Sequence, residues 1–163
     1  MIVKSSGDFF VFGQRNSLSK GNLITLPRNI QYVNLKVGNK KLIVCNVHGI
    51  WAPRSKADTP SRMEQSKKIR EFLSTQEGEK IACGDFNLDI DTESIKILEE
   101  DLKNLIKEFH IEKTRSRLSP FFGKPDFQRF ADYTFVSPGI NVLEFQVPDV
   151  QISDHLPMIL EFV

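Results

Sequence analysis

The feature that most constrains the fold is an almost wholly apolar run that follows a glycine-containing turn. The run is Leu42-Ile43-Val44-Cys45-Asn46-Val47, and Gly38-Asn39-Lys40-Lys41 supplies turn chemistry immediately before it. On the other side of the turn, residues 32–37 alternate apolar and polar side chains. Two such segments around a turn predict a β-hairpin. Because the second segment is almost entirely apolar, we expect it to be a central strand of a sheet.

The rest of the chain adds helices and further strands, and it predicts an α+β domain. Ser61, with Glu64 three residues later, has the spacing of a helix capping box, and Gly78 marks the expected end of that helix. Apolar residues between 95 and 106 recur at helical spacing and predict a second helix. Short apolar runs at 81–83, 133–136 and 158–162 predict strands. At 163 residues, the chain is expected to form one domain over residues 1–163.

Composition narrows the class of protein. A net charge of +1 excludes a globally basic nucleic-acid binder but permits a local basic patch. No apolar run approaches the length of a membrane span, and no secretory signal is visible at the start. Cys45 and Cys83 both lie inside apolar runs, which favours two reduced thiols in a cytoplasmic protein over a disulfide or a reactive thiol.

Two motifs at the boundaries of apolar runs carry the chemistry. They are Gly84-Asp85-Phe86-Asn87 and Ser153-Asp154-His155-Leu156-Pro157. Hydrolysis of a phosphoester requires a cation to neutralise the phosphate, an acceptor for a proton of water and donors for the transition state. Mg²⁺ prefers carboxylate oxygens, so Asp85 and Asp154 are candidate ligands. If the first motif is extended, Asp85 and Asn87 share one face, where Asn87 can donate to phosphate.

Each motif also has a structural alternative. Asp85 and Asn87 could satisfy the backbone of a turn, and Asp154 could cap a local turn. His155 could be a half-buried histidine with an ordinary hydrogen-bond partner, rather than a donor to phosphate. The motifs indicate a metal-assisted phosphoester hydrolase only when they are considered together.

Four motifs in order resemble those of the endonuclease/exonuclease/phosphatase superfamily, which includes deoxyribonuclease I, exonuclease III and the inositol polyphosphate 5-phosphatases. They are Asn46-Val47-His48-Gly49, Gly84-Asp85-Phe86-Asn87, Ala131-Asp132-Tyr133-Thr134-Phe135-Val136-Ser137 and Ser153-Asp154-His155-Leu156-Pro157. The resemblance runs from about Gly21 to the C-terminus. It implies a deoxyribonuclease I-like α+β fold, a four-layer, two-sheet β-sandwich flanked by helices. It also implies a phosphoesterase that depends on Mg²⁺ or Mn²⁺.

The resemblance implies a role for six residues. Asp85 is similar to the family aspartate that orients the attacking water, and it is a second candidate metal ligand. Asn87 resembles the phosphate-binding asparagine, and Asp154 resembles a metal-site acid.

His155 resembles the histidine that contacts the scissile phosphate, and Asp132 the aspartate that orients that histidine. His48 falls where many members carry a histidine that donates to a phosphate oxygen or to the leaving group. The structural alternatives are a surface acid at the start of a strand for Asp132 and a satisfied core histidine for His48.

The chain departs from the family pattern at its start. The family domain begins with a strand–helix–strand unit that supplies the main metal-binding glutamate from a Gln-Glu pair, and nothing before Gly21 matches it. The first glutamate is Glu64, on a predicted helix face. We therefore expect an N-terminally incomplete domain with weak Mg²⁺ or Mn²⁺ binding. We also expect an exposed sheet edge that a homodimer would cover.

The substrate is expected to be a phosphodiester, with nucleic acid as one candidate. The polar loop over residues 113–129 interleaves cations with aromatics, which suits a nucleic-acid backbone, a phosphorylated lipid headgroup or a plain solvated loop. Its cationic and aromatic residues are Lys113, Arg115, Arg117, Phe121, Phe122, Lys124, Phe127 and Arg129. Trp51, Arg54 and Lys56 follow His48 and are expected beside the same cleft. The residues expected to contact substrate are Asn46, Trp51, Arg117 and Arg129.

Two functions follow from these observations. The first is a divalent-metal-dependent phosphodiester hydrolase, nuclease-like in its substrate. The alternative is a catalytically impaired or truncated remnant that acts as a phosphate- or nucleic-acid-binding module.

Overall fold

The computed structural model describes residues 1–15, 17, 23–53, 55–125 and 127–163. In this part of the chain, the strands form a six-stranded sheet of order β1-β2-β3-β4-β6-β5 and a two-stranded sheet of β7 and β8. The strands are β1 (Ile2–Phe12), β2 (Arg28–Val37), β3 (Lys40–His48), β4 (Glu79–Asp85), β5 (Lys103–Asn104), β6 (Asp132–Val136), β7 (Val142–Gln146) and β8 (Ile159–Phe162). The helices are α1 (Pro60–Ser74), α2 (Glu93–Glu99) and α3 (Leu105–Glu108), with a 3₁₀ turn η1 (Leu23–Thr25).

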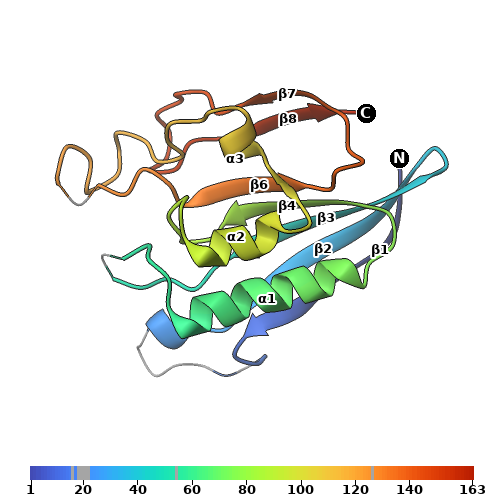
Figure 1. The fold of residues 1–163 in the computed structure, drawn as a ribbon, viewed down its shortest axis with the longest axis horizontal. Helices are drawn as coiled ribbons and strands as arrows, with labels where there is room; N and C mark the ends of the chain where they lie inside the picture. The colour runs from blue at the N-terminus through green and yellow to red at the C-terminus, as the bar shows by residue number, and fades with distance from the viewer. Residues whose placement is uncertain (16, 18–22, 54, 126) are drawn as a thin grey trace.

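The large sheet lies between two covering layers. Helices α1 and α2 lie side by side over one face, and β7 and β8 cover the other (Figure 1). Strand β6 lies inside this sandwich and is buried at every position. Phe86 packs edge-on against Tyr133 and Phe135, at centroid distances of 5.9 Å and 5.3 Å. The expected α+β fold with two sheets and flanking helices is confirmed.

The predicted hairpin is confirmed. Strands β2 and β3 pair antiparallel across a turn in which Gly38 adopts a φ of 60°, a conformation that favours glycine. Strand β3 lies in the middle of the large sheet, because it also pairs in parallel with β4. Cys45 is buried on β3, Cys83 is half-buried on β4, and both are free thiols.

The predicted start of the first helix is wrong by two residues. The N-cap is Thr59, whose Oγ1 accepts a hydrogen bond from the Arg62 amide at 3.2 Å. Pro60 then occupies the first helical position, where its missing N–H costs no helical hydrogen bond. Glu64 lies exposed on α1, as the sequence indicated.

The second predicted helix is two short helices in the structure. Lys103 and Asn104 interrupt the apolar stripe because they pair as β5 with Val136 and Phe135 of β6. The Asn104 side chain then accepts a hydrogen bond from the Ile106 amide at 3.1 Å and caps α3. Sheet pairing outweighs the helical spacing of the apolar residues at this point.

The large sheet ends in an exposed edge at β1. Most of β1 is exposed, including Ile2 and Val3 at 58% and 62% of their surface. An exposed edge was expected, and the homodimer that would cover it stays a prediction. Within the described residues, no helix is both long and apolar enough to cross a membrane.

Candidate active site

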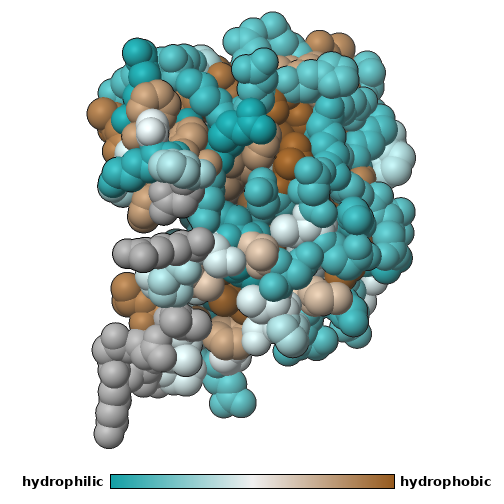
Figure 2. Space-filling view, turned by 60° about the vertical axis from the view of Figure 1, so that its left-hand side comes forward, coloured by the Kyte–Doolittle hydropathy of each residue, from teal (hydrophilic) through white to brown (hydrophobic). Residues whose placement is uncertain are grey.

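Three predicted site residues lie in one row across neighbouring strands. His48 on β3 is paired with Asp85 on the parallel strand β4, and Asp85 is paired with Asp132 on the antiparallel strand β6. The row marks the end of the sheet from which the loops after β3 and β4 and before β6 emerge (Figure 1). Figure 2 turns this end of the molecule toward the viewer.

Close backbone packing explains the glycine that precedes Asp85. Gly84 has a φ of 129°, and a Cβ atom there would lie 2.1 Å from the carbonyl oxygen of Val47. The carbonyl of Asp85 accepts a hydrogen bond from the Gly49 amide at 2.6 Å. The Phe86 amide donates to the carbonyl of Ala131 at 2.8 Å. These contacts lock the end of β4 between its two neighbours, so the Asp85 side chain is presented from a rigid position.

The segment after Asp85 is a turn and not an extended segment, which agrees with the structural alternative for this motif. Asn87 has a φ of 57°, and its amide donates to Oδ1 of Asp85 at 2.8 Å. Its side chain is buried, with Nδ2 donating to the carbonyl of Gly49 at 3.3 Å and Oδ1 accepting from Lys56. The side chains of Asp85 and Asn87 nevertheless line the same cleft, because the turn brings Asn87 back toward β3.

Asp132 and His155 form a hydrogen-bonded pair. Nδ1 of His155 lies 2.7 Å from Oδ2 of Asp132, across 23 residues of sequence. The hydrogen bond to Asp132 raises the pKa of His155 above its ordinary value. Burial raises the pKa of Asp132, and the hydrogen bond from His155 opposes that rise. The pair fixes the orientation of the imidazole ring, as the family resemblance implies.

Arg115 contacts both residues of the second motif. Its guanidinium Nη1 lies 2.7 Å from Nε2 of His155, and Nη2 donates to Oδ2 of Asp154 at 2.7 Å. A guanidinium has only donors, so Nε2 of His155 accepts this hydrogen bond. His155 therefore carries its proton on Nδ1, facing Asp132, while Arg115 is bound to it.

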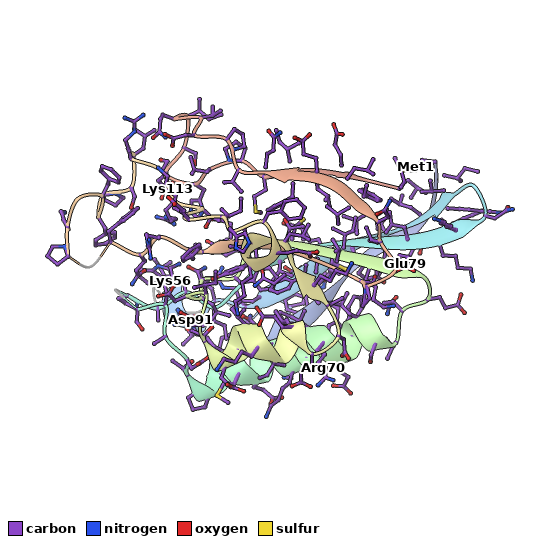
Figure 3. All side chains as sticks on the ribbon, turned by 45° about the horizontal axis from the view of Figure 1, so that its top comes forward. Met1, Lys56, Arg70, Glu79, Asp91 and Lys113 are labelled. Atoms are coloured by element: carbon purple, nitrogen blue, oxygen red, sulfur yellow. The ribbon has the colours of Figure 1, made fainter. Side chains whose placement is uncertain are left out.

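The site residues surround a cleft of about 330 Å³. It is lined by His48, Trp51, Ala52, Lys56, Asp85, Asn87, Arg115, Ser119, Phe121, Gln128, Asp154 and His155. Burial and the nearby charge of Arg28 lower the pKa of His48, so this histidine is neutral at pH 7. Figure 3 shows Lys56 on the loop between β3 and α1, at this end of the molecule.

The donor set fits a hard divalent cation. Asp85, Asp132 and His155 each offer a ligand atom, and these atoms lie within 4.8 Å of one another. Carboxylate oxygens are the ligands that Mg²⁺ and Mn²⁺ prefer. The sequence predicted Asp85 and Asp154 as the two metal ligands. In the structure, Asp85 is grouped with Asp132, and Asp154 lines the cleft in an ion pair with Arg115.

Three residues expected to contact substrate do not line the cleft. Asn46 is exposed on β3, and Arg117 pairs loosely with Asp149 at 3.7 Å. Arg129 packs over the ring of Phe130, with its guanidinium carbon 5.8 Å from the ring centroid. Trp51, the fourth, lines the cleft, and Arg54 lies outside the described residues.

Sequence reasoning missed the position of Arg115. The sequence marked it as one of several cations in a loop, and 40 residues separate it from His155. Ser119, Phe121 and Gln128 reach the cleft from the same loop. No local pattern separates them from neighbours such as Arg117, because the path of the loop selects which side chains face inward.

The buried Lys56 predicts a specific pH dependence of the free energy of unfolding. Burial lowers its pKa to about 8, against the attraction of Asp85. In the unfolded chain, Lys56 has its ordinary, higher pKa and keeps its proton to higher pH. The charged, buried Lys56 therefore lowers the free energy of unfolding at neutral pH, and this loss disappears as the pH rises above about 8. Between pH 7.5 and 9.5, we expect the free energy of unfolding of the wild type to gain about 1–2 kcal/mol relative to Lys56→Met.

Urea unfolding of both proteins at the two pH values measures this difference. Subtracting the variant removes the titration of all other groups. An identical pH dependence in the two proteins would show that Lys56 keeps an ordinary pKa.

Thr114 ties the loop to the end of β6. Its buried Oγ1 accepts hydrogen bonds from the amides of Ala131 and Asp132, both at 3.1 Å. Thr114→Val keeps the shape but leaves both amides without an acceptor, so we expect a loss of about 2 kcal/mol in the free energy of unfolding. The matched control is Thr75→Val at an exposed helix end, with an expected change within about 0.5 kcal/mol. Equal effects in urea unfolding would contradict the buried role of Thr114.

Comparison with solved structures identifies the fold. A Bacteroides thetaiotaomicron protein of the endonuclease/exonuclease/phosphatase family matches with a TM-score of 0.76 and 20% identity, over 99% of this chain and 63% of that one. The chain has the fold of that family. The mannosyl-6-phosphatase Bt3783 of the same organism matches with a TM-score of 0.72 and 22% identity, over 99% of this chain and 67% of that one.

A further match is TDP2 of D. rerio, in a structure complexed with a single-strand DNA product. Its TM-score is 0.70 and its identity 13%, over 99% of this chain and 68% of that one. The chain thus spans 63–68% of the length of these three proteins. No family model and no curated protein matches the chain by sequence.

Proposed function

We propose that this chain is a divalent-metal-dependent phosphodiester hydrolase, nuclease-like in its substrate. One observation carries the proposal: the Asp132–His155 pair lies beside Asp85 at the end of the sheet, in a cleft, on the fold of phosphoester hydrolases. We assign the protein to the cytoplasm, in keeping with its two free thiols.

The proposed mechanism assigns Asp85 as the proton acceptor. A water oxygen attacks phosphorus, its proton passes to the Asp85 carboxylate, and the bond from phosphorus to the leaving oxygen breaks. A bound divalent ion, held by Asp85 with Asp132 or Asp154, would neutralise charge on the phosphate oxygens.

The histidines and Asn87 act on the phosphate. Once Arg115 has left it, Nε2 of His155 takes up a proton, which the hydrogen bond to Asp132 favours because it raises the pKa of His155. The imidazolium, oriented by Asp132, then donates its Nε2 hydrogen to a phosphate oxygen. His48, in the same row, hydrogen-bonds the leaving oxygen. Asn87 has one Nδ2 hydrogen beyond its bond to Gly49, and it contributes this hydrogen to the phosphate.

Aromatic rings on the cleft support a nucleic-acid substrate. Trp51 and Phe121 line it and are 37% and 38% exposed, so part of each ring is accessible to bases that stack. The Lys124 ammonium lies 5.7 Å from the centroid of the Phe121 ring, where it adds a positive charge. The two rings come from two different loops, one after β3 and one before β6. TDP2, one of the similar structures, is complexed with a single-strand DNA product.

The second candidate is a phosphate- or nucleic-acid-binding module without turnover. Arg115 engages both Asp154 and His155, and within the described residues no glutamate lines the cleft. A binding module of this kind binds Mg²⁺ weakly. Submillimolar Mg²⁺ affinity in a calorimetric titration would count against it.

The test of the first proposal is a hydrolysis panel. Plasmid DNA, single-stranded oligonucleotide, RNA and a generic phosphodiester are each incubated with Mg²⁺, with Mn²⁺ and with chelator. Asp85→Asn protein, prepared in parallel, controls for contaminating nucleases. We expect cleavage of at least one substrate that requires both metal and Asp85. A folded protein that cleaves none of them would favour the binding module.

A further inference from the structure

The contact of Arg115 with the second motif is a bidentate bridge between two functional groups. Its two terminal nitrogens engage Nε2 of His155 and Oδ2 of Asp154, each at 2.7 Å. The Arg115 side chain is 14% exposed, whereas the Asp154 side chain is 43% exposed. The same fork therefore occupies the predicted phosphate-binding nitrogen and the predicted metal-binding carboxylate at once.

Backbone hydrogen bonds on both sides hold Arg115 in place. The amides of Thr114 and Arg115 donate to the carbonyl of Arg129 at 2.8 Å and 3.1 Å. On the opposite side, the Leu156 amide donates to the backbone carbonyl of Thr114 at 2.9 Å, and the Ser116 amide donates to the backbone carbonyl of Asp154 at 3.0 Å. The segment is thus inserted between the two chain segments that carry Asp132 and Asp154. Its arginine is positioned by the fold rather than by chance contact of a surface side chain.

The charges around the row balance one another. Three acids face the cleft or lie beside it: Asp85, Asp132 and Asp154. Lys56 and Arg115 line the same cleft, and Arg28 lies close enough to interact electrostatically with Asp85 and His48. A divalent ion therefore enters surroundings in which protein cations already compensate the acids, and these cations oppose its binding.

We propose that Arg115 is an internal counter-cation that competes with the divalent ion for Asp154. Binding of the ion displaces Nη2 from Asp154. Because the two contacts belong to one rigid guanidinium, Nη1 leaves His155 in the same movement. Metal binding then exposes Nε2 of His155 to the phosphate, so the site becomes competent only when the ion is present.

The inference deepens the proposed function and rests on two parts of it: Asp154, rather than Asp132, holds the ion beside Asp85, and His155 contacts the phosphate. Its test measures metal affinity and not hydrolysis, so the counter-cation proposal and the proposed hydrolase function can be contradicted independently. Tight metal binding after removal of Arg115 would support the counter-cation even if no substrate were cleaved. Substrate cleavage with metal affinity insensitive to Arg115 would support the hydrolase alone.

The experiment measures Mn²⁺ affinity by electron paramagnetic resonance in the wild type and three variants. Arg115→Gln keeps a polar side chain without the charge, and we expect it to bind Mn²⁺ about tenfold more tightly than the wild type. Lys113→Gln is the matched control, because it also removes one positive charge from the same loop. Lys113 lies two residues before Arg115, and its side chain pairs with Asp149. Figure 3 labels Lys113. Its affinity should stay within twofold of the wild type.

The third variant, Arg115→Gln combined with Asp154→Asn, assigns the effect to Asp154. We expect the added substitution to abolish the tenfold gain. Equal or weaker Mn²⁺ binding by Arg115→Gln would overturn the proposal, as would a gain equally large in Lys113→Gln or one that survives Asp154→Asn. No detectable Mn²⁺ binding by any of the proteins would also overturn it.

A second measurement follows Arg115 in the wild type itself, so its result does not depend on the folding of Arg115→Gln. Mg²⁺ is titrated while the Nε–Hε resonances of the arginines are followed by NMR, with Arg115 assigned from the signal lost in Arg115→Lys. We expect the Arg115 signal to shift with the midpoint of Mg²⁺ binding. An Arg115 signal that stays constant through saturation would overturn the displacement.

Discussion

Asp85→Asn is expected to lower the rate of metal-dependent phosphodiester cleavage by about 10²–10⁴-fold, the range typical for loss of a general base. An asparagine at this position is nearly isosteric. Its oxygen can still accept the hydrogen bond that the Asn87 amide donates to Oδ1 at 2.8 Å. What is lost is the ability to take a proton from water and the negative charge that attracts the cation. The turn after β4 should therefore survive while turnover falls.

The control for this variant is Asp101→Asn. Asp101 is an exposed acid that pairs with Arg70 at 2.5 Å and takes no part in the cleft. Rates are measured on whichever substrate of the panel the wild type cleaves, with circular dichroism and urea unfolding to verify the fold. Unchanged turnover in Asp85→Asn would refute the role of Asp85. An equal fall in Asp101→Asn would show that charge loss anywhere on the protein lowers the rate.

Arg62→Met is expected to cost about 3–5 kcal/mol in the free energy of unfolding, because it leaves three backbone carbonyls without a donor and each buried unpaired polar group costs about 1–3 kcal/mol. Arg62 is 1% exposed, although it lies on α1. Its guanidinium donates to the carbonyls of Ile50, Ser55 and Ala57, at 3.1 Å, 3.0 Å and 2.6 Å. Methionine fills a similar length but leaves three carbonyls without their donor.

The loop that Arg62 holds carries Trp51 and Lys56 into the cleft. We therefore expect Arg62→Met to weaken any activity of the cleft as well as the fold. Arg70→Met on the same helix is the matched control. Arg70 pairs with Glu100 and Asp101 on the surface and is 37% exposed, so its loss should cost at most about 1 kcal/mol. Figure 3 labels Arg70 at the helical layer, away from Lys56. Urea unfolding of the two variants tests the contrast, and similar losses would contradict it.

Much of the scaffold was predictable because its signals are local. The hairpin of β2 and β3 followed from alternation, a glycine turn and an apolar run, all within 20 residues. The end of β4 at Asp85 followed from the Gly84-Asp85 motif, where glycine permits the close backbone approach to β3. The family resemblance implied that Asp132 pairs with His155, and the structure places the two atoms 2.7 Å apart.

Two local patterns did not predict the structure, and both were overridden by contacts with residues distant in sequence. The apolar stripe between residues 95 and 106 has helical spacing, yet β5 interrupts it because Lys103 and Asn104 pair with the edge of β6. The turn at Asn87 replaces an extended segment, because its side chain has partners on the loops after β3. Such partners are distant in sequence and leave no periodic signal.

Local sequence is enough to predict which acids and histidines the chain can present, because strand ends and glycine turns are encoded by neighbouring residues. The surroundings of these side chains depend on tertiary packing. Arg115 lies on Asp154 and His155 because its loop is held between two segments by backbone hydrogen bonds. Among the loop cations, that path alone distinguishes Arg115 from Arg117 and Arg129. Whether a charge faces a cleft or solvent depends on the course of the whole chain, and one residue type at one position does not encode it.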